Sequence, residues 1–441
     1  MLVKSGKMNK LNFVAHLTPY LSNKVLRSTL IYTIAGGFNA AIPFFILPVL
    51  TAYLSPEEYG VVSTFMVFNS IFLIVIGIEQ YSFISVNFYT HSSEEIRGYI
   101  SNIITISFLL FFFFILSAIL FSTHFQSISQ VRAQWILFSV IVAFFQFLSQ
   151  VGLTVWQLNN EPFRYGLYQV LHSLFNYSLS IFLIAQFRLG EGGRIWGITI
   201  SAMIFGLYSL FYLFQKKLIS YRISVKDIKS SLIFSLPLVP HAFAGWINTA
   251  SDRLIINNYV GISETGIYSI NYQIAMVISL LAGSFNRAFI PFIFKTLSKG
   301  TDDGKIKLVR YTYFYYITLI ILALLLALTS PYILELLVNE KYQKSQAVIY
   351  WIIIGFTADG LYYGVINYLF YAKKTTHISL ITFSSCILHF IISFFLIPRI
   401  GVIGAAYSTS VSFVFSFIIA WIVSNKAFPM PWSLTISNFN K

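Results

Sequence analysis

Long apolar stretches follow one another along the whole chain, separated by short polar connections. A stretch of about 20 apolar residues has the length of an α-helix that crosses a bilayer. The stretches lack the two-residue alternation of a membrane β-strand, and a helix satisfies its backbone hydrogen bonds within one segment. The pattern predicts an all-α polytopic membrane protein with twelve transmembrane helices. We expect them at residues 28–50, 61–88, 100–121, 134–155, 166–187, 195–214, 232–258, 266–290, 311–330, 347–371, 377–397 and 402–424.

Composition agrees with this prediction. Of the 441 residues, 57% are hydrophobic and 10% are charged, whereas an average soluble domain is about 25% charged. The first 27 residues are polar and basic, and no small-residue cleavage site follows them, so we expect a retained first helix and not a removed signal peptide. Cys386 is the only cysteine in the sequence, which excludes an intramolecular disulfide and a cysteine metal site. We therefore expect no metal and no cofactor.

The distribution of lysine and arginine predicts the orientation, because these residues are retained in the cytoplasm. Of the 29 positive residues, 22 fall on the face that carries both termini, which we therefore assign to the cytoplasm. The net charge of +14 is mainly this topology signal and gives no support for nucleic-acid binding, although a basic inner face suits anionic lipid headgroups. The six positive residues assigned to the opposite face are Arg132, Arg188, Arg194, Lys341, Lys344 and Arg399.

An internal repeat divides the chain into two halves. A pattern of Tyr, Glu, Gly and Ser recurs at an offset of 206 residues, and a Gly and Ser pair recurs at 207. Six helices per half is an even number, so the halves are parallel repeats, an architecture typical of transporters with a central cleft. The matched pairs are Tyr53 and Tyr259, Glu58 and Glu264, Gly60 and Gly266, Ser63 and Ser269, Gly197 and Gly404, and Ser201 and Ser408.

The domain boundaries follow from the repeat and from the two longest polar connections, residues 215–231 and about 295–310, both on the cytoplasmic face. The first lies at the midpoint and is predicted to link the halves, with a surface-lying amphipathic segment as one form it could take. We expect a cytoplasmic N-terminus (1–27), an N-lobe (28–214), a linker (215–231), a C-lobe (232–424) and a cytoplasmic tail (425–441).

The region of the seventh predicted helix contains charged residues that are unusual in an apolar span. Asp252 and Arg253 lie in one bilayer crossing, where each unpaired charge costs at least about 2.5–3.5 kcal/mol. Neighbouring residues of a helix point about 100° apart, so each of the two needs a different partner or a water-filled cavity. A structural ion pair between helices and a functional cavity are both compatible with this pattern.

Three segments of the sequence resemble the Wzx-type polysaccharide flippases, which export O-antigen and capsule repeat units. They are LPLVPH with SDRLII and GISETGIYS (residues 236–269), LSPEEYGVVS (54–63) and IPRIGVIGAAYSTS (397–410). The resemblance implies two six-helix lobes around a V-shaped cavity, as in the related drug (MATE) exporters. It also implies transport of undecaprenyl-pyrophosphate-linked oligosaccharide from the cytoplasmic to the periplasmic leaflet of the bacterial inner membrane. The implied partners are this lipid, the bilayer, a polysaccharide polymerase and a chain-length regulator, and we expect a monomer.

Such a substrate requires positive charge for its pyrophosphate and hydrogen bonds for its glycan. Arginine makes bidentate contacts to phosphate oxygens, and Arg253 is our first candidate, with topology or snorkelling as the competing explanation for the others. The remaining candidates for the pyrophosphate are Arg27, Arg287 and Arg310. Aromatic and amide side chains that could form a glycan-contact region, or only pack between helices, are Tyr32, Asn39, Trp246, Asn248, Tyr362, Tyr363 and Asn367.

Acidic residues within the spans could couple transport to a proton gradient, because a desolvated carboxyl group can take up a proton on one side and release it on the other. The competing role is an ion pair of Asp359 with Arg253. Proline removes a backbone hydrogen bond and bends a helix, which predicts hinges in the first helix of each half. The candidate cavity or coupling residues are Asp252, Asp359, Glu79 and His241, and the candidate hinges are Pro43, Pro48, Pro237 and Pro240.

Two other functions stay open from the sequence alone. A cation-coupled exporter of small drugs would have the same fold. A polytopic polysaccharide polymerase or ligase should present a large outer loop with catalytic residues, yet the longest outer connections, about 122–133 and 331–346, do not combine acids with histidine in such an arrangement. No nucleotide loop or nucleophile arrangement appears either.

Overall fold

The computed structural model describes residues 24–220 and 224–433, and in these ranges every regular element is a helix. Twelve helical segments are long and apolar enough to cross a membrane, which confirms the number predicted from the sequence. In chain order the elements are α2 (Lys24–Tyr53), α3 (Pro56–Gly77), α4 (Gln80–Asn87), α5 (Ser93–Leu120), α6 (Ser122–Ser129), α7 (Ala133–Leu158), α8 (Pro162–Phe187), α9 (Gly190–Gln215), α10 (Val225–Ser235), η1 (Leu236–Leu238), α11 (Val239–Tyr259), α12 (Ile262–Ala275), α13 (Val277–Leu297), α14 (Asp302–Leu337), η2 (Glu340–Ser345), α15 (Gln346–Tyr371), α16 (Thr375–Ile400) and α17 (Val402–Ala427).

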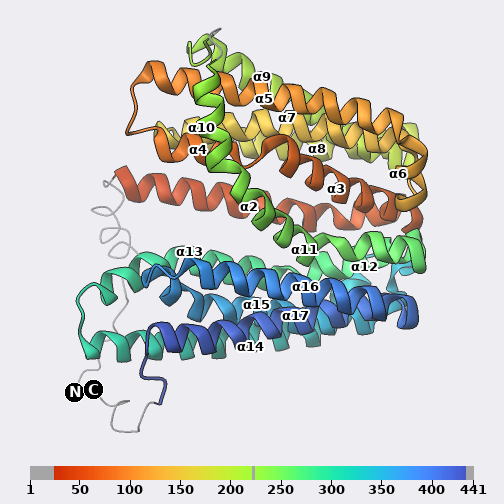
Figure 1. The fold of residues 1–441 in the computed structure, drawn as a ribbon. Coiled ribbons are helices and arrows are strands. Elements are labelled where there is room, and N and C mark those ends of the chain that lie inside the picture. Colours follow the sequence, from red (N-terminus) through yellow and green to blue (C-terminus); the bar gives the residue numbers. More distant parts are fainter. Residues whose placement is uncertain (1–23, 221–223, 434–441) are drawn as a thin grey trace, which may run out of the picture.

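The helices form two bundles. Helices α3 to α9 lie in the upper part of Figure 1 and α13 to α17 in the lower part, with α2, α11 and α12 between them. Each bundle has its own apolar core, one centred on α3, α5 and α7 and the other on α12, α15 and α17. We call the end where α2 begins and α17 ends the basic end, at the left in Figure 1.

Three of the predicted spans are interrupted, and in the span 266–290 α12 ends at Ala275 and α13 begins at Val277. The sequence predicted one helix over 61–88, but the helix stops at Gly77 and a new one starts at Gln80. Ile78 and Glu79 both adopt left-handed backbone conformations, with φ of 45° and 52°, so the α-helical hydrogen-bond ladder cannot run through them. Hydrophobicity alone cannot reveal such a break, because the apolar pattern continues across it.

The seventh span is divided between the bundles. Its first part, α10, packs on α4 and α5, and its second part, α11, packs on α16. The 3₁₀ turn η1, which contains Pro237, joins the two parts, and Pro240 lies in the first turn of α11. Residues 225–231 of the expected linker form the beginning of α10.

Close packing of α3 on α12 joins the two halves at the end opposite the basic end. A Cβ atom on Gly60 would overlap the carbonyl oxygen of Ile262, and one on Gly266 would overlap the carbonyl oxygen of Pro56. The two contacts are equivalent under the repeat, since Pro56 and Ile262 are also 206 residues apart. Only glycine therefore allows this approach of the two helices.

Polar contacts reinforce the junction from this end to the middle of the helices. The hydroxyl oxygens of Ser63 and Ser269, a matched pair of the repeat, lie 2.6 Å apart. Asn257 donates to the Thr64 hydroxyl at 2.7 Å, and the Tyr342 hydroxyl donates to the Leu54 carbonyl at 2.9 Å. The lobes are thus held together away from the basic end.

Candidate functional site

A cavity of about 360 Å³ lies between the two halves, and we call it the central cavity. Helices α2, α3, α8 and α9 of the first half and α11 and α12 of the second contribute to its wall. Its polar lining residues are Tyr59, Ser63, Ser70, Tyr177, Arg194, Arg253, Ser269, Tyr272 and Gln273. The wall therefore contains two arginines, one from each half.

Arg253 reaches this cavity from α11. Its Nη1 donates to the Thr249 carbonyl at 2.7 Å, and its Nε donates to the Ser269 hydroxyl at 3.2 Å. The guanidinium lies over the Tyr272 ring, 4.6 Å from the ring centre. These contacts fix the side chain at the wall of the cavity and leave its charge without an acidic partner among the described residues.

Arg194 corrects a prediction from the sequence. We assigned it to the outer connection before the sixth helix, but it lies inside α9, and only 7% of the residue is exposed. Its Nη1 donates to Asn176 Oδ1 at 2.5 Å and to Ser180 Oγ at 2.7 Å, and the guanidinium lies 4.3 Å from the centre of the Tyr177 ring. The polar run GEGGR before an apolar stretch gave no sign of this burial.

The two guanidinium groups form one positively charged wall. Tyr59 lies within electrostatic reach of both, and all three residues line the central cavity. No lining residue of this cavity is an aspartate or glutamate, and neither arginine forms an ion pair with an acid of the described ranges. An uncompensated charge in a low-dielectric wall attracts an anion strongly.

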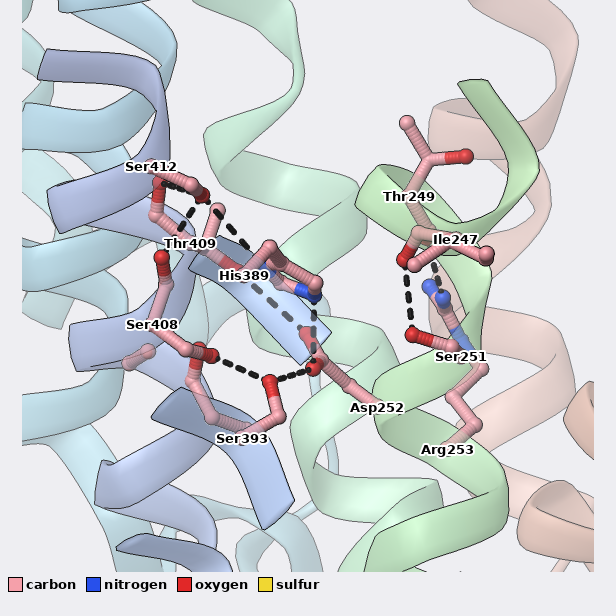
Figure 2. Close-up of polar contacts among 12 residues, drawn as sticks. Ile247, Thr249, Ser251, Asp252, Arg253, His389, Ser393, Ser408, Thr409 and Ser412 are labelled. Carbon is pink, nitrogen blue, oxygen red and sulfur yellow. Dashed lines mark hydrogen bonds and ion pairs between the residues drawn. The ribbon is translucent and has the colours of Figure 1, made fainter. Parts of the chain in front are cut away.

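Asp252 points away from Arg253 into the second bundle, as Figure 2 shows. Its carboxylate accepts hydrogen bonds from Tyr268 and Ser393, both at 2.8 Å, and from Thr409 at 3.3 Å. His389 Nε2 of α16 lies 3.0 Å from Asp252 Oδ1, so the two form a buried ion pair when the imidazole is protonated. Different surroundings for neighbouring residues 252 and 253 agree with their 100° separation on the helix.

The other two acids lie apart from Arg253. Asp359, half-buried in α15, accepts a hydrogen bond from Ser279 at 2.8 Å, and no ion pair joins it to Arg253. Glu79 lies at the break between α3 and α4 and lines a second cavity, of about 390 Å³, within the first bundle. Each of the three acids of the spans therefore has its own environment.

Arg287, Arg310 and His241 do not line the central cavity. Arg287 is exposed on α13 and donates to the Ser284 hydroxyl at 3.0 Å. Arg310 is half-buried in α14, and His241 is exposed in the first turn of α11. Arg27 belongs to the first turn of α2, but its side chain lies outside the described part of the structure.

The candidate glycan contacts are not gathered in one place. Trp246 Nε1 of α11 donates to Ser70 of α3 at 3.1 Å across the two halves, and Asn248 is buried on the same helix. Asn367 on α15 donates to Asn286 at 2.7 Å, and Tyr362 and Tyr363 precede it on that helix.

Tyr32 and Asn39 belong to the first bundle. The Tyr32 ring makes an edge contact with Tyr165 at 5.0 Å, and Asn39 accepts a hydrogen bond from Ser173. Asn39 lines the second cavity. Pro43 and Pro48 lie inside α2, which continues through both, and Pro43 lines the central cavity. No group of three or more His, Cys, Asp or Glu side chains that could hold a metal ion occurs in the described residues.

The fold is that of known membrane transporters. The structure of the lipid II flippase MurJ, in an inward closed conformation, superposes with a TM-score of 0.72 at 14% identity, over 93% of this chain and 89% of that one. An inward-facing multidrug resistance MATE family transporter of the MOP superfamily gives a TM-score of 0.68 at 12% identity, over 88% and 94% of the two chains. The chain thus has the MATE-like fold of two six-helix lobes around a central cavity, as expected.

Residues 25–297 match the family described as polysaccharide biosynthesis protein, and the chain belongs to this family. It is 24% identical to the Lsg locus putative protein 1 of Haemophilus influenzae over 377 residues, which cover 83% of this chain and 90% of the relative. It is 25% identical to the capsular polysaccharide biosynthesis protein CapF of Staphylococcus aureus over 391 residues, 86% and 94% of the two chains. The family is one of polysaccharide biosynthesis and the fold is shared with a lipid II flippase and a MATE transporter, which confirms the resemblance to polysaccharide flippases.

Proposed function

We propose that the protein is a flippase that moves undecaprenyl-pyrophosphate-linked oligosaccharide repeat units from the cytoplasmic to the periplasmic leaflet by alternating access. The observation that carries the proposal is the pair of arginines in the central cavity, Arg194 and Arg253, which have no acidic partner among the described residues. A pyrophosphate has two adjacent anionic groups, and two guanidinium groups that line the same cavity can bind them with charge-assisted hydrogen bonds.

The membership of a polysaccharide biosynthesis family supports a glycan-bearing cargo. The polyprenyl tail can remain in the lipid during transport, so the protein has to provide a polar path only for the pyrophosphate and the sugars. O-antigen and capsule units both satisfy this description. The arginine pair binds the part that all such lipids share.

Orientation is part of the proposal. The basic end, where α2 begins and α17 ends, faces the cytoplasm of the bacterial inner membrane, because lysine and arginine are concentrated in its connections. The contact of α3 with α12 closes the opposite, periplasmic end. A substrate would then enter from the cytoplasmic leaflet and leave when this contact opens.

Coupling to the proton gradient belongs to the same proposal, and Asp252 is the acid best situated for it. It is 1% exposed, and its charge is shared with His389 on α16 and with the hydroxyls of Tyr268, Ser393 and Thr409. A proton added to this pair changes the buried charge that holds α11 against α16 and α17. Arg253, one residue further on α11, would respond to the resulting shift of that helix.

A cation-coupled exporter of small drugs is the alternative with the same fold. Drugs carried by such exporters are commonly cationic, and the central cavity, with two arginines and no acid in its wall, repels cations. The arginine pair therefore favours an anionic lipid substrate.

Complementation tests the proposal. In a strain that lacks the chromosomal copy, wild type should restore surface polysaccharide, and Arg253→Ala or Arg194→Ala should leave intact repeat units on the cytoplasmic face. Loss of one buried charge partner costs about 2–5 kcal/mol of binding, so we expect transport to fall more than tenfold. Lysine at either position keeps the charge but not the bidentate geometry and should restore only part of the activity.

Arg399→Ala is the matched control, since Arg399 is exposed in the last turn of α16. It should transport like wild type. Normal transport by well-expressed Arg194→Ala and Arg253→Ala variants would exclude the arginine site. Repeat units that reach the outer face of the deletion strain and fail only to polymerise would exclude a flippase.

A further inference from the structure

The second cavity, which we call the N-half cavity, lies inside the first bundle and is unlike the central cavity in its chemistry. Its volume is about 390 Å³, within the range of small-molecule sites. Its wall contains one carboxylate and no lysine or arginine. The polar residues that line it are Asn39, Glu79, Tyr81, Gln146, Ser149, Gln150, Tyr168, Gln169, His172 and Ser173.

Side-chain amides and hydroxyls predominate in this wall, and some of them lack partners. Gln169 Oε1 and His172 Nε2 are buried and have no hydrogen-bond partner in the structure. A buried polar atom without a partner is costly. Both atoms are covered by neighbouring protein atoms, so a ligand would bond to them only after these side chains rotate toward the cavity. The Tyr168 ring and Phe147 in the same wall provide apolar faces for the C–H groups of a sugar ring.

The walls of the two cavities contain neighbouring residues of α2 and α3. On α2, Asn39 lines the N-half cavity and Ala40 lines the central cavity. On α3, Leu73 lines the first and Ser70 the second, and three residues of an α-helix span only about 4.5 Å. The walls of the two cavities therefore adjoin on α2 and α3, and we infer that a group bonded directly to a pyrophosphate in the central cavity passes between these helices into the N-half cavity.

We propose that the N-half cavity binds the sugar residue next to the pyrophosphate and selects a sugar that is neutral or bears an amine over one that bears a carboxylate. This inference rests on the proposed function. Glu79, from the break between α3 and α4, is the selecting residue, because a sugar carboxylate would face the Glu79 carboxylate with no cation in the wall to separate them. Gln146 and Gln150, which line the cavity, hydrogen-bond the hydroxyl groups.

This assignment gives the break between α3 and α4 a role in ligand binding. In a continuous helix, residue 79 would follow the helical rotation of α3, whereas the left-handed conformations of Ile78 and Glu79 redirect the chain and bring Glu79 and Tyr81 to the same cavity. Uncommon backbone conformations of this kind are often found at ligand sites. The Glu79 carboxylate also interacts with the neighbouring Tyr81 side chain.

A binding experiment separates this inference from the proposed function. Full-length protein in lipid nanodiscs is titrated with three probes: undecaprenyl pyrophosphate alone, the same lipid with one N-acetylglucosamine, and the same lipid with one glucuronic acid. The neutral sugar should lower the Kd at least about tenfold relative to the bare lipid, a gain that two or so net hydrogen bonds can provide. The glucuronyl lipid should gain nothing.

Two substitutions assign the effect to the cavity. Glu79→Gln should remove the discrimination, so that both glycolipids bind about equally, and Gln150→Leu should reduce the gain from the neutral sugar. Neither should change the Kd of the bare lipid, which also verifies that each variant is folded. Glu335→Gln is the matched control, because Glu335 is exposed on α14 in the other half, and it should behave like wild type.

The outcomes are distinct. If the bare lipid binds and neither sugar lowers the Kd, the sugar site is overturned and the arginine site remains. Equal binding of the neutral and the glucuronyl lipid by wild type, or unchanged discrimination in Glu79→Gln, overturns the role of Glu79. If the bare lipid does not bind, and Arg194→Ala and Arg253→Ala do not lower transport in the complementation assay, the proposed function itself is wrong.

Discussion

Arg194 holds a positive charge inside the protein with uncharged oxygens and an aromatic ring as its partners. Asn176 and Ser180 accept from it, and Tyr177 stacks beneath it. These groups orient a guanidinium without neutralising it. Arg253 has the same kind of surroundings, a backbone carbonyl, a hydroxyl and a tyrosine ring. Both guanidinium groups are therefore oriented and uncompensated, so they can bind an anionic ligand.

At the Asp252–His389 pair we predict that Asp252→Asn uncouples transport from the proton gradient. The amide keeps the volume of the carboxylate and one of its two acceptor oxygens, but it cannot take up a proton or pair with an imidazolium. Flipping in reconstituted vesicles, measured with an imposed proton gradient and again after its collapse, should depend on the gradient in wild type and not in the variant. Gradient-independent flipping by wild type would contradict proton coupling.

The neighbouring residues 252 and 253 illustrate what the sequence can and cannot predict about a site. Helical geometry predicted that the two side chains need different environments, and they have them. The partner of Asp252 could not be predicted, because His389 is 137 residues away and the pairing depends on the packing of α11 on α16. Burial of Arg194 was missed for a related reason: its position one turn inside α9 is not visible from hydrophobicity.

Among the elements, α3 and α12 decide how closely the halves approach each other. Gly60 and Gly266 each face a backbone carbonyl of the other helix. The recurrence of these glycines was visible in the sequence, but not that the two copies of the motif meet. A repeat reveals equivalence of positions, whereas contact between the equivalent positions depends on where the symmetry axis runs.

We predict that Gly60→Ala and Gly266→Ala destabilise the protein, although alanine favours a helix over glycine by up to about 1 kcal/mol. The added methyl group cannot displace a backbone carbonyl, and overpacking of this kind costs about 1–3 kcal/mol. The midpoint of thermal unfolding in detergent should fall for both variants. Gly36→Ala and Gly245→Ala are the matched controls, since no atom lies within 4 Å of an added Cβ there, and their midpoints should not fall.

The break between α3 and α4 and the break between α10 and α11 differ in how far the sequence predicted them. The sequence predicted one span over 232–258 that bends at Pro237 and Pro240, and the second break lies at these prolines. Pro43 and Pro48 lie within the continuous helix α2, so proline alone does not predict a break. The first break follows Gly77, and its two left-handed residues, Ile78 and Glu79, are not of a type that favours this conformation, so the sequence did not predict it. The role of Pro43, Pro48, Pro237 and Pro240 as hinges stays a prediction.

For the whole molecule, alternating access requires that the contact between the halves opens and closes. We predict that a disulfide between Ser63→Cys and Ser269→Cys, in a Cys386→Ser background, stops transport and that a reductant restores it. The two hydroxyl oxygens are 2.6 Å apart, so a sulfur–sulfur bond of about 2.05 Å needs little movement. Each single cysteine variant serves as control, and full activity of the cross-linked protein would contradict the mechanism.

The orientation of the molecule in the membrane gives a further prediction. Lys299→Cys, at the basic end, should react with a membrane-impermeant maleimide only after the inner membrane is opened. Glu340→Cys, in η2 at the opposite end, should react in cells whose inner membrane is intact. Both positions are exposed in the structure. The reverse labelling pattern would contradict cytoplasmic termini.

The glycine contact also bears on the origin of the chain. Gly60 meets residue 262 while Gly266 meets residue 56, so each half offers the other the same patch of surface. A self-complementary patch of this kind is the isologous interface of a two-fold symmetric dimer. An ancestral gene for one half could have made a working homodimer before duplication and fusion. After fusion the two halves could diverge away from this contact, and in this chain the first half has a cavity lined by Glu79 whereas the second has a buried Asp252.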